Sequence, residues 1–234
     1  IDGIEWRRKK WSILASKYLR LAEFIAVKFS DYVIADNDII SNYVRETYNI
    51  NSHTIAYGGD TFKNPIVLKN MGFALSICRI EPENNIHIIL KSFSTTGYKL
   101  FFIGNWDSSN YGRKLKEHYN NKSQISCIDP IYDQDKIQVL RSECSLYIHG
   151  HSAGGTNPSL VEMMFYGKDI IAYDCSFNRV TLGGHGSFFR NSSELSSFVN
   201  DHKVDNHNQS MIEYAHSNYT WKLIRRKYYK LLRI

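Results

Sequence analysis

The chain has 234 residues, of which 43% are hydrophobic and 14% aromatic, and its net charge is +6. This length allows one large domain or two small ones, each with a buried core. No apolar run reaches the roughly 18 residues that a membrane-spanning helix needs, and no secretory leader is visible. The chain begins with Ile1 and not with Met, so we expect it to be part of a longer protein.

The positive charge lies at the two ends of the chain. Residues 1–30 carry a net charge of +4 and residues 214–234 one of +6, which leaves about −4 for the middle. A nucleic-acid-binding surface would need basic residues interleaved with aromatic ones along the middle, so we set that class aside. No Cys-x-x-Cys pair occurs, which favours reduced, packed thiols of a cytosolic protein for the cysteines at 78, 127, 144 and 175.

The first sixty residues predict half of an α/β unit. A long amphipathic basic helix over about 9–29 precedes a strand over 31–36, and a second helix over 38–48 precedes a strand over 53–60. Two strands are too few for an independent sheet. We therefore expect this region to be the end of a larger amino-terminal domain.

From residue 73 onward, short apolar strands alternate with helices. Strands are predicted over 73–80, 99–105, 124–129, 144–150, 169–174 and 187–189. Helices are predicted over 84–93, 111–120, 132–142, 158–167, 177–182 and 192–199. Near-continuous apolar strands separated by helices indicate a parallel sheet buried on both faces, a doubly wound Rossmann-like fold. The tail from about 209 to 233 predicts one more helix.

The segment HSAGGTNPSLVEMM, residues 151–164, joins a predicted strand to a predicted helix. Ligands of doubly wound sheets bind in such loops, at the carboxyl ends of the strands. Asn157 is a candidate N-cap for a helix that opens with Pro158 and stops at Gly167. Gly154 and Gly155 would let the backbone come close to a ligand, and the helix amino terminus would favour an anion. A glycine turn without a ligand is the alternative.

Glu162 is the single acid within the apolar run of this helix, beside Val161 and Met163. A buried carboxylate without a partner costs free energy. Two hydrogen bonds from a ribose diol would remove that cost, and an internal arginine or backbone partner would do so equally well. Both interpretations stay open.

Arg79 ends the first strand of the predicted sheet, within CRIEPENN at 78–85. A cation at this place faces the same crevice and suits a diphosphate. The alternative is a surface ion pair with Glu81 or Glu83. Arg79, the amides of 154–157 and Glu162 together predict a site for a nucleoside diphosphate.

Two other polar clusters have simpler explanations. Asp36-Asn37-Asp38 matches the Asp-x-Asp pattern of metal-dependent sugar transferases, but it lies where a strand leads into a helix. We favour helix capping there, with Asp38 as a good cap. His149 and His151 have no third ligand at metal spacing, which favours a polar contact near the loop over a zinc site.

Four ordered motifs resemble those of bacterial rhamnosyltransferase-type glycosyltransferases, in the family-4 group of retaining GT-B enzymes. They are DGIEWRRKKW, CRIEPENN, IGNWDSSNYGRKL and HSAGGTNPSLVEMM. The resemblance implies two Rossmann-like domains that face each other across a cleft. It also implies that residues 1–60 end the acceptor domain, that 61–205 bind the nucleotide-sugar donor, and that 206–234 form a helix returning towards the first domain.

The resemblance assigns roles to individual residues. Glu162 matches the second Glu of a Glu-seven residues-Glu motif, which binds the nucleotide ribose, and Gly154 stands in place of the first Glu. Arg79 matches the phosphate-binding Arg, Asn84 replaces the usual Lys, and Asp2 lies where many relatives carry a His at the catalytic cleft.

These correspondences, together with the glycine-rich loop and Tyr132 in the loop after QISCID, predict two overlapping sets of residues. The catalytic set is Arg79, Glu162 and Asp2. The donor-binding set is Arg79, Asn84, Tyr132, Gly154, Gly155, Thr156, Asn157 and Glu162, with Tyr132 packing near the base. No metal or other cofactor is expected, so Arg79 and the helix amino terminus would have to stabilise the leaving diphosphate.

The expected reaction moves a hexosyl group, L-rhamnose from a dTDP or UDP donor, to a glycan or lipid-linked acceptor with retention, in cell-surface polysaccharide synthesis. We expect a cytoplasmic enzyme whose basic first helix either lies on an anionic membrane or packs against the rest of the first domain. This segment alone is expected to be inactive. A nucleotide-sugar-binding module without activity and a sugar-nucleotide epimerase of the same fold are the alternatives.

Overall fold

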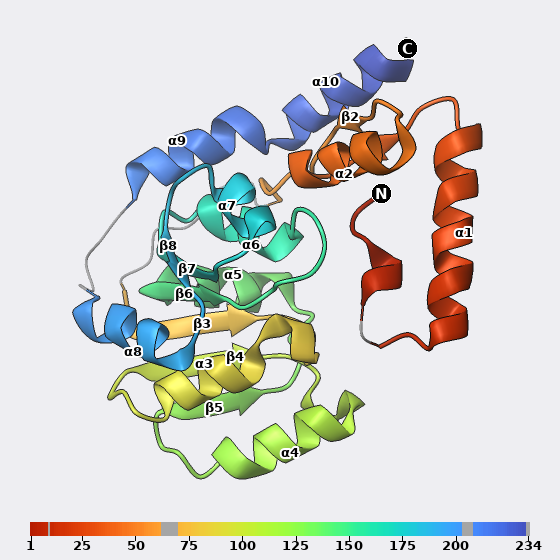
Figure 1. Cartoon of the computed structure of the whole chain (residues 1–234). Coiled ribbons are helices and arrows are strands. Elements are labelled where there is room, and N and C mark those ends of the chain that lie inside the picture. The colour runs from red at the N-terminus through yellow and green to blue at the C-terminus, as the bar shows by residue number, and fades with distance from the viewer. Residues whose placement is uncertain (9, 62–69, 203–207, 233–234) are drawn as a thin grey trace.

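The computed structural model of the chain describes residues 1–8, 10–61, 70–202 and 208–232. Within these residues, the main sheet has six parallel strands in the order β5-β4-β3-β6-β7-β8 (Figure 1). The strands are β3 (Phe73–Ile77), β4 (Lys99–Ile103), β5 (Ile125–Ile128), β6 (Leu146–His149), β7 (Asp169–Tyr173) and β8 (Ser187–Phe189). The predicted doubly wound parallel sheet is confirmed.

The order of the strands reverses at the centre of the sheet. β3 pairs with β4 on one side and with β6 on the other, and Ala74 lies between Leu100 and Leu146. From β3 the chain builds outward through β4 and β5, and from β6 it builds outward in the opposite direction through β7 and β8. A crevice opens at such a reversal, outside the carboxyl ends of the two central strands.

Helices cover both faces of the sheet, as the apolar strands require. One face packs on α3 (Ile86–Phe93), α4 (Asn110–Tyr119) and α8 (Ser192–Asp201). The other packs on α5 (Gln134–Glu143), α6 (Pro158–Met164), α7 (Ser176–Leu182) and α9 (Gln209–Asn218). Adjacent residues of one strand point to opposite faces: Phe102 belongs to the first core and Phe101 packs against the second. Each fully buried side chain of this size contributes about 1.5–3 kcal/mol.

The amino-terminal region forms a smaller unit beside the main sheet. It contains the 3₁₀ turn η1 (Glu5–Arg7), α1 (Ile13–Phe29), β1 (Ile34–Ala35), α2 (Asp38–Tyr48) and β2 (His53–Thr54). β1 and β2 pair in parallel. The helix predicted over 9–29 begins at Ile13, because the hydroxyl of Ser12 accepts a hydrogen bond from the amide of Ala15 and caps it. Residue 9 lies outside the described residues.

The prediction of a single carboxyl-terminal helix is wrong. The described part of the tail forms two helices, α9 (Gln209–Asn218) and α10 (Trp221–Leu232). Tyr219 leaves the helical conformation because its hydroxyl donates to the carbonyl of Thr181 at 2.9 Å and its own carbonyl accepts from the amide of Gly59 at 2.8 Å. α10 begins beside the segment after β2, where the amide of Trp221 donates to Oδ1 of Asp60 at 2.6 Å, and it lies on the amino-terminal side of the molecule (Figure 1). Residues 206, 207 and 233–234 lie outside the described residues.

Among the described residues, no helix has the length and apolar character needed to cross a bilayer.

Candidate active site

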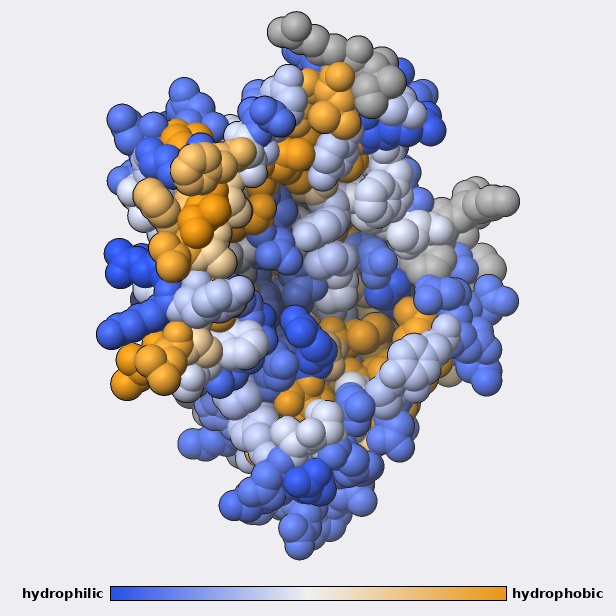
Figure 2. Space-filling model, turned by 90° about the vertical axis from the view of Figure 1, so that its right-hand side faces the viewer, coloured by the Kyte–Doolittle hydropathy of each residue, from blue (hydrophilic) through white to orange (hydrophobic). Residues whose placement is uncertain are grey.

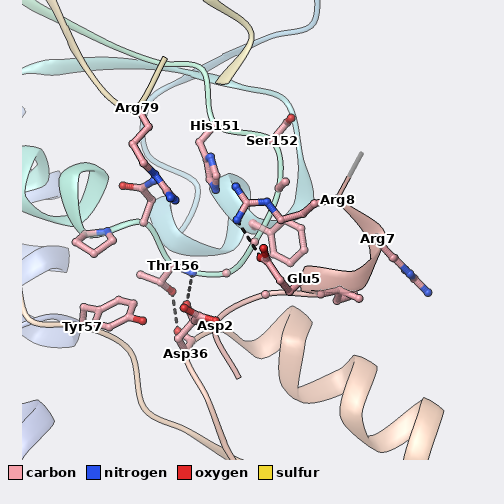
Figure 3. Close-up of a pocket in the computed structure, with 18 residues that line it drawn as sticks. Asp2, Glu5, Arg7, Arg8, Asp36, Tyr57, Arg79, His151, Ser152 and Thr156 are labelled. Carbon is pink, nitrogen blue, oxygen red and sulfur yellow. Dashed lines mark hydrogen bonds and ion pairs between the residues drawn. The ribbon is translucent and has the colours of Figure 1, made fainter. Parts of the chain in front are cut away.

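A cavity of about 440 Å³ lies where the strand order reverses. Arg79 follows β3, and the loop from His151 to Asn157 follows β6, so the two central strands deliver both segments to the same edge of the sheet. The opposite wall comes from the amino-terminal region and includes Asp2, Asp36 and Tyr57 (Figure 3). The structure thus brings together six predicted residues: Asp2, Arg79, Gly154, Gly155, Thr156 and Asn157.

The guanidinium of Arg79 has no carboxylate partner in the described part of the chain. The sequence offered Glu81 and Glu83 as partners, but both of these side chains bind Arg8. Arg79 is exposed and points into the cavity (Figure 3). A surface ion pair with Glu81 or Glu83 is therefore not what holds Arg79, and its charge faces the space available to a ligand.

Arg8 was not predicted as a site residue. It follows η1, and its side chain, only 14% exposed, forms ion pairs with Glu5 at 2.9 Å, with Glu81 at 3.1 Å and with Glu83. Burial raises the pKa of Glu5, but hydrogen bonds from Arg8, Lys10 and Trp11 lower it to about 2. Arg8 lines the cavity and ties the amino-terminal segment to the loop after β3. In the sequence, Arg8 is only one basic residue in a basic run, and nothing there indicates its distant partners.

Asn84 is buried behind the cavity and forms hydrogen bonds with two of the residues that line it. It is 3% exposed and lies outside the residues that line the cavity. Its amide nitrogen donates to the carbonyl of Arg79 at 2.6 Å, so its Oδ1, 2.6 Å from Nδ1 of His151, accepts from that ring. Burial, with Arg8 and Arg79 nearby, lowers the pKa of His151 to about 4, which keeps the ring neutral at pH 7. Asn84 thus orients two cavity residues.

The loop before α6 is held by hydrogen bonds to the amino-terminal region. Gly154 has φ +107°, a conformation that favours glycine. The amide of Gly155 donates to the carbonyl of Asp2 at 2.9 Å, and the amide of Thr156 donates to Oδ2 of Asp36 at 2.9 Å. Asn157 caps α6 as predicted, because its Oδ1 accepts from the amide of Ser159 at 3.0 Å. The amides of 155 and 156, expected to bind a diphosphate, have protein acceptors instead.

The three residues of the Asp36-Asn37-Asp38 cluster have roles that differ from the predicted ones. Asn37, and not Asp38, caps α2, because its Oδ1 accepts from the amide of Ile39 at 3.0 Å. Asp38 is the exposed first residue of the helix. Asp36 is a cavity residue that sequence reasoning missed, since its carboxylate reaches a loop 120 positions away in the chain. Burial raises its pKa to about 6, the Thr156 hydrogen bond opposes this rise, and nearby Asp2 adds to it.

Glu162 has an internal partner, as one of its two interpretations allowed. Its carboxylate forms a hydrogen-bonded ion pair with Arg141 of α5, whose side chain is 6% exposed. Glu162 itself keeps 20% of its side chain exposed, and it is absent from the lining of the cavity. The ion pair accounts for the acid in an apolar helix. A role for the exposed part of Glu162 in binding ribose stays a prediction.

Tyr132 lines a second cavity of about 450 Å³. This cavity lies at the carboxyl ends of β3, β4 and β5, and its walls include Ile103, Gly104 and Ile131. Tyr132 is 85% exposed at its edge. Arg79 lines both cavities, so one cation stands at their junction.

The two histidines near this loop do not form a metal site with other described residues. His149 is buried, and burial lowers its pKa to about 3, while His151 contacts Asn84. Within the described ranges, no group of three or more His, Cys, Asp or Glu side chains has an arrangement that could hold a metal ion.

Two family models match the sequence. A domain of unknown function, DUF1972, matches residues 1–60, and the model described as glycosyl transferases group 1 matches residues 60–215. The chain belongs to the glycosyl transferases group 1 family. No curated protein matches the chain.

Three solved structures share the fold of this group 1 chain. TarM, from S. aureus, superposes with a TM-score of 0.79 at 14% identity, over 99% of this chain and 49% of TarM. HepE from Anabaena, in complex with UDP, gives 0.76 at 16% identity, over 100% of this chain and 71% of HepE. The pneumococcal O-GlcNAc transferase GtfA, in complex with UDP and GlcNAc, gives 0.72 at 13% identity, over 91% and 46%. The chain thus spans about half the length of TarM and GtfA.

Proposed function

We propose that the protein is a retaining glycosyltransferase that moves a hexosyl group, L-rhamnose, from a dTDP- or UDP-sugar to a glycan or lipid-linked oligosaccharide. The observation that carries this proposal is the cavity at the reversal of strand order. The guanidinium of Arg79, which has no carboxylate partner among the described residues, faces this cavity. An arginine in that position matches a diphosphate in both charge and geometry.

The two cavities that share Arg79 fit the two halves of a nucleotide sugar. Volumes of about 440 and 450 Å³ lie within the usual range for small-molecule sites. We place the diphosphate at Arg79, the nucleoside in the cavity with Tyr132, and the sugar in the cavity with Asp2. The ribose then lies on the side of α5 and α6, where the exposed part of Glu162 is its proposed contact.

Arg79 is the main stabiliser of the leaving group in this mechanism. Cleavage of the bond between the sugar and the diphosphate develops negative charge on the phosphate oxygen, and a fixed cation stabilises that charge. The amides of 155 and 156 already bind Asp2 and Asp36, so they stabilise the loop and not the diphosphate. We propose that no metal takes part and that the acceptor attacks the same face of the sugar that the diphosphate leaves, which retains the configuration.

The solved structures support the donor class. HepE structures are described with UDP, with UDP and glucose, and with UDP-glucose, and GtfA is described with UDP and GlcNAc. The family match supports a transferase. The choice of L-rhamnose rests on the resemblance of the GGTNPSL and PENN segments to those of rhamnosyltransferase-type enzymes.

The exposed side of α1 supports a peripheral contact with an anionic membrane on the cytoplasmic side, where a lipid-linked acceptor would lie. Figure 2 shows patches of apolar side chains separated by charged ones on the face that includes this helix. Leu14, Phe24 and Phe29 are 80%, 44% and 83% exposed, and Lys17 and Lys28 are exposed as well. Flotation of the full-length protein with anionic vesicles tests this contact, and salt-insensitive or absent binding contradicts it.

The decisive experiment screens the full-length protein against a panel of dTDP- and UDP-sugars, with acceptor glycans present, for release of the nucleoside diphosphate. Release together with a new glycoside of retained configuration supports the proposal. Nucleotide-sugar binding without release favours a binding module, and conversion of the donor sugar to its epimer favours an epimerase. Absence of binding to any nucleotide contradicts all three.

A further inference from the structure

One carboxylate oxygen in the main cavity has no hydrogen-bond partner in the described part of the chain. Asp36 is 6% exposed, and its Oδ2 accepts from the amide of Thr156 at 2.9 Å. Its Oδ1 is buried and unpartnered. A carboxylate oxygen left in this state is costly, and a hydrogen-bond donor on a ligand in the cavity would remove that cost.

The surroundings of Asp36 restrict what kind of donor this is. Asp2 lies beside it, and the hydroxyl of Tyr57 points towards it from the same wall, whereas Arg79 and His151 point in from the opposite wall (Figure 3). Two carboxylates repel a phosphate but accept hydrogen bonds from neutral hydroxyl groups. The part of the cavity beside Asp2 and Asp36 therefore suits hydroxyl groups, and the part beside Arg79 suits an anion.

We propose that Oδ1 of Asp36 accepts a hydrogen bond from a hydroxyl group of the donor's sugar. The proposal rests on the glycosyltransferase function given above. The loop GHSAGGTN, residues 150–157, has no acid of its own, and Asp36 supplies one from a different part of the chain.

The contact with Thr156 places this oxygen next to the donor and not at a distant acceptor site. Oδ2 of Asp36 is hydrogen-bonded to the loop that lines the cavity together with Arg79, so Asp36 lies in the same cavity as a diphosphate bound at Arg79. Gly155 lets the carboxylate of Asp36 pack against this loop, because a Cβ there would lie 1.9 Å from Oδ1 of Asp36. Asp36 is thus a binding residue for the sugar and an anchor for the loop.

The substitution Asp36→Asn separates these two roles. Asparagine has one acceptor oxygen, so it keeps the hydrogen bond from Thr156 or accepts from the sugar, but not both. In the full-length protein, calorimetry would compare UDP and dTDP with UDP-glucose, UDP-N-acetylglucosamine and dTDP-L-rhamnose. We expect D36N to change the Kd of UDP and dTDP by less than twofold and to raise that of the best-bound nucleotide sugar about tenfold.

Two further variants serve as controls. Asp38→Asn makes the same chemical change two residues away, on an exposed side chain outside the cavity, and should leave every Kd within twofold. Thr156→Val removes the hydroxyl that donates to the carbonyl of Asp36 at 2.7 Å, and so loosens the loop without touching the carboxylate. We expect T156V to raise the Kd of the nucleoside diphosphates and that of the nucleotide sugars by the same factor.

The outcomes separate this proposal from the proposed function. If wild type binds nucleotide sugars and D36N binds them equally well, the assignment of Asp36 is wrong while the proposed function stands. If D36N raises the Kd of the nucleoside diphosphates and of the nucleotide sugars equally, Asp36 is only a loop anchor and the assignment is wrong. The same holds if T156V raises the Kd of the nucleotide sugars alone, as D36N is expected to do. A wild type that binds none of the probes contradicts the proposed function, and the assignment falls with it.

Discussion

The two walls of the main cavity differ in both origin and charge. Arg79 and His151 come from the ends of β3 and β6, two central strands that are buried on both faces. Asp2, Asp36 and Tyr57 come from an amino-terminal region whose strands are only two residues long. Among the described residues, the sheet wall carries a cation without a carboxylate partner, Arg79. The amino-terminal wall carries Asp2 and Asp36, while Arg8 of that wall is paired with acids and Arg7 points away from the cavity (Figure 3). The comparison indicates that the sheet supplies phosphate affinity and that the amino-terminal region supplies selectivity for the sugar.

The largest expected effect comes from the sheet wall. Arg79→Ala removes the cation that faces the leaving diphosphate, and we expect the rate of nucleoside diphosphate release to fall by about 100- to 1000-fold. The matched control is Arg226→Ala, which removes an exposed arginine of α10 outside both cavities. Assays of release with the best donor compare the two variants. A loss of less than tenfold in R79A would show that the diphosphate is stabilised elsewhere.

For the amino-terminal wall we expect a substitution to be favourable in one respect: replacing Asp36 should raise the free energy of unfolding. The folded-state pKa of Asp36 is raised from 3.8 to about 6, so its ionised form costs free energy in the folded protein above pH 6. About two pKa units at about 1.4 kcal/mol each give about 3 kcal/mol. D36N should therefore be more stable than wild type by up to that amount at pH 8.

The pH dependence of this gain checks its cause. Since the folded protein binds the proton more tightly than the unfolded chain, the cost in wild type declines as pH falls through 6 and disappears below about 4. Denaturant unfolding at pH 8 and pH 5 should show a stability gain for D36N that falls to about half at pH 5. A gain that is the same at both values would mean that Asp36 is not the titrating group.

The contact between the two walls gives a third test. Gly155→Ala would place a Cβ 1.9 Å from Oδ1 of Asp36, which forces the loop and the carboxylate apart. We expect a loss of about 2 kcal/mol in the free energy of unfolding, typical of overpacking. Gly97→Ala is the control, because a Cβ at that position has no atom within 4 Å among the described residues other than its chain neighbours. Equal stabilities of G155A and G97A would contradict the tight contact.

The smallest expected effect concerns Glu162. Its ion pair with Arg141 explains its place in the helix but does not decide whether it also binds the ribose. If the exposed part of Glu162 binds the ribose, Glu162→Gln should weaken the affinity for UDP about tenfold but leave the affinity for 2′,3′-dideoxy-UDP unchanged. The reason is that the dideoxy nucleotide has no hydroxyl groups for the carboxylate to accept from. Calorimetry measures both ligands on both proteins. Equal weakening of the two ligands would assign Glu162 to the ion pair alone.

Local patterns were enough to predict the sheet and one wall of the site. Apolar runs such as FALSI and KLFFI have no polar face, so they predict strands buried on both sides, and β3 and β4 occupy those positions. The rule that ligands bind at the carboxyl ends of such strands then placed Arg79 and the loop of Gly154 in one site. Asn157 was predicted as a cap because capping depends on residues only a few positions apart.

The other wall depends on contacts between residues far apart in the chain. Asp36 and Thr156 are separated by 120 positions, and Arg8 binds Glu81 across 73. Hydrogen-bond partners at such separations leave no periodic signal in the sequence, so Asp36 was interpreted as part of a cap and Arg8 as one charge in a basic run. The break between α9 and α10 has the same origin, since Tyr219 turns towards Thr181 and Gly59 only in the folded protein. Periodicity and turn chemistry are local and specify the sheet. The placement of Asp36 in the same cavity as Arg79 arises only when two distant segments pack together.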